Sequence, residues 1–88
     1  MKLKDVIELL VKGIVQDEDA VAVEEIKGEI LHGKQTFHYK IKVKSEEISL
    51  LVGKNGMTIK SLRTLMSKLA GKQKLMAFID IDESDKNG

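Results

Sequence analysis

Residues 51–62 read Leu51-Val52-Gly53-Lys54-Asn55-Gly56-Met57-Thr58-Ile59-Lys60-Ser61-Leu62. Two apolar residues precede a G-x-x-G loop, and apolar residues follow at the third and sixth positions beyond it. A bare G-x-x-G is common, so its meaning depends on its surroundings. Here a short apolar segment leads into the loop, and a longer segment with helical spacing leads out. The pattern predicts two helices joined by a tight glycine turn.

The loop has the features of a site for a phosphate group. Glycines at both ends allow a sharp turn and let the backbone approach an anion closely. The helix expected from Met57 would offer unpaired N–H groups and the positive end of its dipole. Lys54 adds a positive charge, and Asn55 tolerates turn geometry and can donate a hydrogen bond. The alternative is a plain helix–helix turn in which Lys54 only aids solubility.

Enzymatic chemistry finds no support in the sequence. The phosphate loop of nucleotide hydrolases reads G-x-x-x-x-G-K-[ST] after a strand, whereas this lysine lies between glycines that follow a helix. Asp80 and Asp82 share one face of an expected strand, without a third ligand or a nucleophile nearby. There is no cysteine, and two isolated histidines do not make a tetrahedral metal centre. We expect no catalysis, metal or cofactor.

Charge is distributed unevenly along a chain whose net charge is only +1. Residues 1–47 carry eight Lys or Arg against ten Asp or Glu. Residues 48–79 carry no acid and six basic residues: Lys54, Lys60, Arg63, Lys68, Lys72 and Lys74. One cationic segment on a nearly neutral protein is typical of a protein that binds a polyanion. We expect Lys60 to meet a phosphate, whereas Lys68 and the row Lys40, Lys42 and Lys44 are expected to face solvent.

Hydrophobic spacing predicts three helices. They are expected over residues 3–16, 46–52 and 57–70. Ser45 is a good N-cap for the short second helix, and Glu46 and Glu47 suit its positive end. Gly71 is the expected C-cap of the long third helix.

Alternating and β-branched segments predict three strands. They are expected over residues 20–27, 36–44 and 75–82, with a turn at 31–35. A strand-helix-helix-strand crossover favours a parallel pair, so we place 36–44 centrally, antiparallel to 20–27 and parallel to 75–82. His32 and His38 are expected in a turn and on a strand surface. The fold class is α/β: a three-stranded mixed sheet packed on one side by three helices, in one domain over 1–83 with a short polar tail at 84–88.

The helix-strand-strand-helix-helix-strand order with this G-x-x-G resembles a type II KH domain, and Arg63-Thr64-Leu65 makes the chain similar to the bacterial single-domain KhpA family. The resemblance covers about residues 1–82, although the family's frequent proline is absent from 17–19. In such domains the loop clamps about four nucleotides of single-stranded RNA, and bases lie in an apolar groove beside a sheet edge. The resemblance assigns the RNA backbone to Gly53, Lys54, Asn55, Gly56 and Lys60. It assigns groove walls to Ile48, Leu51, Val52 and Ile59, some of which are expected to be ordinary core.

The resemblance also implies partners. Family members pair with themselves or with the larger KH protein KhpB (Jag or EloR), in roles tied to cell shape, as RNA chaperones or post-transcriptional regulators. Arg63 and Thr64 are the candidate interface residues, and Arg63 suits RNA contact equally well. The chain has only three aromatic residues and no run of the RNP type, so a stacking platform is not the expected mode of binding. The competing hypothesis is a module that mainly binds a partner protein.

The sequence has neither a signal peptide nor an apolar run of the roughly 20 residues that a membrane span needs. We therefore expect a cytoplasmic protein without membrane association.

Overall fold

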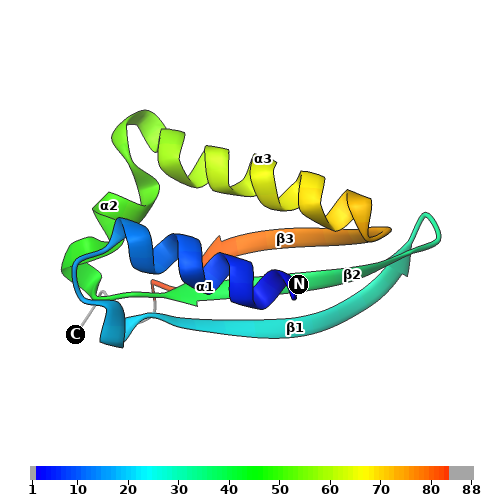
Figure 1. Cartoon of the computed structure of the whole chain (residues 1–88), viewed down its shortest axis with the longest axis horizontal. Coiled ribbons are helices and arrows are strands. Elements are labelled where there is room, and N and C mark those ends of the chain that lie inside the picture. Colours follow the sequence, from blue (N-terminus) through cyan, green and yellow to red (C-terminus); the bar gives the residue numbers. More distant parts are fainter. Residues whose placement is uncertain (1, 84–88) are drawn as a thin grey trace.

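The computed structural model describes residues 2–83, so the tail expected at 84–88 lies outside the described residues. The α-helices and strands are α1 (Leu3–Ile14), β1 (Ala22–Leu31), β2 (Lys34–Lys42), α2 (Ile48–Val52), α3 (Met57–Lys72) and β3 (Leu75–Ile81). Single-turn 3-10 helices cover Glu18–Ala20, Ser45–Glu47 and Lys54–Gly56. The expected α/β class and element order are confirmed, and the three α-helices lie on one side of the sheet (Figure 1).

The sheet has the order β1-β2-β3 with β2 in the centre. β2 is antiparallel to β1 and parallel to β3, as the sequence predicted. The parallel pair follows from the crossover through α2 and α3, which returns the chain to the starting end of the sheet. One outer edge of the sheet is therefore β3, which runs beneath α3 (Figure 1).

The core fills the space between the sheet and the helices. Alternate residues of β2 face the helices, so that Tyr39 and Ile41 are buried while Lys40 and Lys42 are exposed. From the helices, the buried residues are Leu3, Ile7 and Val11 of α1, Ile48 and Leu51 of α2, and Ile59, Leu62, Met66 and Ala70 of α3. The helical and strand periodicities of the sequence thus converge on one core.

The β1–β2 hairpin is longer and its turn tighter than the sequence predicted. β1 runs through Gly28 to Leu31, and the expected turn at 31–35 is reduced to His32 and Gly33. Both turn residues have positive φ, 52° and 77°, which suits a two-residue hairpin. Gly28 does not end the strand, because its role is close packing: a Cβ there would lie 2.5 Å from Thr36 Oγ1.

Helix ends also differ from expectation. α1 stops at Ile14, two residues early, and Val15 is already extended. α3 continues through Gly71 to Lys72, so the predicted glycine C-cap was wrong. The reversal into β3 occurs instead at Lys74, whose φ is 60°. Hydrogen bonds from the Gln73 and Lys74 amides to Ala70 and Gly71 carbonyls, 2.9 and 3.0 Å long, close the helix.

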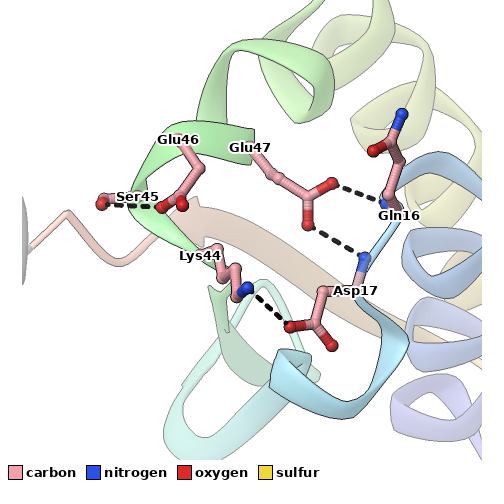
Figure 2. Close-up of polar contacts among 6 residues, drawn as sticks. All are labelled: Gln16, Asp17, Lys44, Ser45, Glu46 and Glu47. Atoms are coloured by element: carbon pink, nitrogen blue, oxygen red, sulfur yellow. Dashed lines mark hydrogen bonds and ion pairs between the residues drawn. The ribbon is translucent and has the colours of Figure 1, made fainter.

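Glu47 connects the end of α1 to the start of α2 (Figure 2). Its carboxylate is buried and accepts hydrogen bonds from the backbone N–H groups of Gln16 at 2.6 Å and Asp17 at 3.0 Å. Ser45, predicted as an N-cap, makes no capping bond and instead lies 3.4 Å from Glu46 Oε1. Glu47 therefore acts across the fold, not on its own helix, and fixes the entry of the chain into α2.

An ion pair lies beside this carboxylate (Figure 2). Lys44 Nζ is 3.0 Å from Asp17 Oδ2. The hydrogen bond from Lys44 lowers the pKa of the Asp17 carboxyl, and the same bond raises the pKa of Lys44. Both side chains are accessible to water, so screening keeps the contribution of this pair to stability small.

Replacing Glu47 with alanine is expected to lower the free energy of unfolding by about 2 kcal/mol, because two partly buried backbone donors lose a charged acceptor. Glu46→Ala is the matched control, since that neighbouring side chain is exposed and should change stability by less than about 0.5 kcal/mol. Chemical denaturation of the two variants measures the difference. Equal stabilities would show that the Glu47 bonds contribute nothing.

Candidate nucleic-acid interface

The G-x-x-G loop joins α2 to α3, and three of its residues have positive φ. Gly53 has φ 79° and ψ 173°, Asn55 has φ 56° and ψ 25°, and Gly56 has φ 74° and ψ 14°. The Gly53 amide donates to the Ser49 carbonyl at 2.9 Å and ends α2. The Gly56 amide donates to the Gly53 carbonyl at 3.1 Å and closes the single turn.

The two glycines are needed for different reasons. A Cβ on Gly53 would lie 2.8 Å from the backbone nitrogen of Thr58, so no side chain fits there. A Cβ on Gly56 would meet nothing within 4 Å and would extend into open space. Gly53 thus shapes the loop, and Gly56 leaves its outer side accessible.

The start of α3 is open to an anion. Its N-cap is Gly56, no side chain caps the first turn, and the first turn contains no acid. The Met57 amide donates to the Lys54 carbonyl, and no side chain caps the other N–H groups of the first turn. These groups and the helix dipole favour a negative ligand. Lys54 and Asn55 are exposed in the loop, and Lys60 is exposed one turn into α3. Lys54 and Asn55 thus lie within the loop, and Lys60 follows it on α3 beside a hollow that it shares with Thr64 and Lys68.

The apolar residues assigned to the groove are mostly interior. Leu51, Ile59 and Ile48 are 0%, 7% and 8% exposed. These side chains therefore offer almost no surface to a base. Val52 is partly exposed. Their spacing is that of any apolar stripe, so the sequence had no signal that distinguished groove wall from core.

Arg63 lies across the free edge of the sheet. Its Nε donates to the Ile79 carbonyl of β3 at 3.0 Å, and its Nη2 is 3.9 Å from Asp80 Oδ1. Thr64 Oγ1 donates to the Lys60 carbonyl of its own helix at 3.0 Å. Arg63 therefore faces β3, and the sequence missed this because the partner atom belongs to the backbone.

Hollows flank α3 on both sides. The hollow beside β3, about 430 Å³, is lined by His38, Arg63, Ser67, Ala77, Phe78, Ile79 and Asp80. The groove between α1 and α3, about 580 Å³, is lined by Leu9, Leu10, Gly13, Ile14, Met57, Thr58, Ser61, Leu62 and Leu65. Leu9 and Met57 are 66% and 64% exposed, and neither was predicted as a surface residue of interest.

Within residues 2–83, no three His, Asp or Glu side chains are grouped in a way that could hold a metal ion. No helix in the same range is long and apolar enough to cross a membrane.

Known proteins match this chain over nearly its whole length. The family model described as KhpA/KhpB, KH domain matches residues 4–81. The RNA-binding protein KhpA of Thermotoga maritima is 39% identical over 72 residues, covering 82% of this chain and 89% of its own. The proteins of the same name from Aquifex aeolicus and Caldanaerobacter subterraneus are 34% and 31% identical, covering 80% and 88% of this chain and 82% and 96% of theirs. With its fold and glycine loop, this chain belongs to the KhpA/KhpB family of KH domains, a family of RNA-binding proteins and not of enzymes.

Proposed function

We propose that the chain binds single-stranded RNA and that Gly53, Lys54, Asn55 and Gly56 hold its backbone. The observation that carries the proposal is the uncapped start of α3 directly beside an exposed lysine and asparagine. Backbone N–H groups and a nearby cation bind phosphate at helix starts in many proteins. Relatives at 31–39% identity bear the name RNA-binding protein, which supports RNA as the polyanion.

The bases are proposed to lie on the β3 side of α3. The hollow there begins at Arg63, on the helix that starts at the loop, and extends over the free edge of β3. Val52 is proposed to contribute apolar surface near the loop, and the exposed Lys60 is proposed to meet a further phosphate. Leu51 and Ile59 support the site from the core beneath it.

The dependence of affinity on salt tests this surface. If Lys54, Lys60 and the loop amides engage two or three phosphates, log affinity for single-stranded RNA should fall with log salt at a slope of roughly −1.5 to −2. Fluorescence anisotropy of a labelled oligonucleotide over a salt series measures the slope. A flat response would mean that the cationic residues are not the contact surface.

In the cell we propose a cytoplasmic RNA chaperone or post-transcriptional regulator that acts on cell shape, as a homodimer or with a KhpB-like partner. One KH domain reads only about four nucleotides, so a second domain raises effective concentration and with it affinity. The match to a family that spans KhpA and KhpB supports a partner of the same fold.

The groove between α1 and α3 suits a second copy of the chain. It combines protruding apolar side chains, Leu9 and Met57, with a hollow beside Gly13, and a two-fold interface needs both on one surface. Arg63 and Thr64, the candidate interface residues from the sequence, lie on α3 but do not line this groove, so the contact proposed here does not use them.

Self-association in the micromolar range is the expected result, and sedimentation velocity measures it. Leu65→Lys places a charge at the groove and should weaken the dimer at least about tenfold. Thr64→Lys is the adjacent control, because Thr64 does not line the α1–α3 groove. A monomer at all concentrations would exclude the homodimer and leave the KhpB-like partner.

A further inference from the structure

His38 and Phe78 form an exposed stacked pair on the open side of the sheet. Their ring centroids are 5.1 Å apart with planes 21° from parallel. They occupy paired positions on β2 and β3, which are neighbours in Figure 1, although 40 positions separate them in the sequence. Phe78 is 39% exposed, so part of its ring faces water.

This pair is distinct from the other aromatic residues of the described chain. Tyr39 is buried and Phe37 packs against the core, both on the side that the helices cover. Stacked rings with accessible faces are the surface on which unpaired bases settle in many RNA-binding proteins. The absence of an RNP-type run argued against a platform, but one pair formed across two strands is invisible to such a pattern.

The pair is continuous with the proposed RNA site. His38 and Phe78 line the same hollow as Arg63 of α3 and the free edge of β3. Arg63 is six residues along α3 from Met57, or roughly 9 Å at the rise of an α-helix. An RNA strand held at the loop therefore reaches the rings within a few nucleotides.

The surroundings favour a base over a protein partner. Ile26 of β1 is 44% exposed and pairs with His38, so the apolar row crosses all three strands. The next row along the open face consists of Glu24, Lys40 and Asp80, so the apolar row ends at a charged one. Among the described residues lining the hollow, Asp80 is the one acid, and it lies 3.9 Å from Arg63. A single row of three side chains is small for a protein interface, and its two aromatic members suit one flat ring with polar edges.

We infer that the His38–Phe78 pair stacks one base of the RNA strand that the glycine loop holds, so that binding has a base-dependent element beyond the phosphate clamp. This inference rests on the proposed function. A base lying on Phe78 would place its neighbouring phosphate toward Arg63, which lines the same hollow.

Nuclear magnetic resonance of the phenylalanine rings provides a direct test. The chain has two phenylalanines, so Phe37 on the covered face is an internal control for Phe78. Titration with an eight-nucleotide oligoadenylate should shift the Phe78 ring signals upfield and leave those of Phe37 in place. An abasic ribose-phosphate strand of the same length should bind through the loop without shifting Phe78.

Affinity measurements on variants complete the test. Phe78→Leu keeps apolar bulk but removes the π face, and should weaken oligoadenylate binding by about five- to a hundredfold. Phe78→Tyr keeps the ring and should bind as the parent does. Ile30→Ala, another exposed apolar change in the sheet, is the control that should leave affinity unchanged.

The outcomes separate this inference from the proposed function. If RNA binds but Phe78 signals stay in place, or the leucine variant binds as tightly as the parent, the stacking site does not exist while the loop clamp survives. If the parent binds no RNA at all, both the stacking inference and the proposed function are wrong. If loop variants keep full affinity while Phe78→Leu loses it, the sheet face, not the loop, is the principal RNA site.

Discussion

Replacing Lys54 and Asn55 together with aspartate is expected to lower affinity for single-stranded RNA by about a hundredfold or more. The local charge falls by three units where a phosphate is proposed to meet the start of α3, so attraction becomes repulsion. The fold should persist, because both side chains are exposed. Asn55 has φ 56°, a conformation that aspartate also tolerates, so stability should change by roughly half a kcal/mol or somewhat more.

A matched control has the same change in net charge elsewhere in the cationic segment. Lys68→Glu with Lys72→Gln also removes three units of charge, from exposed sites near the far end of α3. This control should lose far less affinity, because those side chains are more than a turn beyond Lys60. Fluorescence anisotropy measures the RNA affinity of both double variants, and circular dichroism shows whether each is folded. A folded loop variant that binds RNA as tightly as the parent would favour the protein-interaction hypothesis.

The fold was predictable because each element carries its own periodicity. The apolar spacing of α1 and α3 and the alternation of β2 appear in the sequence, and the crossover rule then fixes β3 parallel to β2. The boundaries were less predictable, since they depend on tertiary contacts. The strand predicted over 20–27 stops before Gly28, yet β1 continues to Leu31 with Gly28 packed closely on Thr36.

The loop conformation was predictable because the backbone there dictates the residue types. Gly53, Asn55 and Gly56 all have positive φ, so residue type alone indicated the turn. Residue type does not say which apolar side chains are exposed, and Leu51 and Ile59 prove to be buried. The role of Glu47 was also hidden, because its partners are backbone amides about 30 positions away.

Alanine should destabilise the fold much more at Gly53 than at Gly56. Gly53 has φ 79° and ψ 173°, a region that is almost exclusive to glycine, and a Cβ would collide with the backbone of Thr58. Gly53→Ala should therefore lower the free energy of unfolding by about 3 kcal/mol or more. Gly56 has φ 74° with open space around it, so Gly56→Ala should cost only about 1 kcal/mol.

Gly56→Ala should have its main effect on RNA affinity and not on stability. Gly56→Ala remains folded but places a methyl group in the open space where the phosphate is proposed to sit, so RNA binding should weaken about tenfold or more. Urea denaturation gives the stability of each variant, and anisotropy gives the affinity of the folded fraction. If Gly56→Ala binds RNA normally, the strand does not approach that side of the loop, and the phosphate must be held from the side of Lys54 instead.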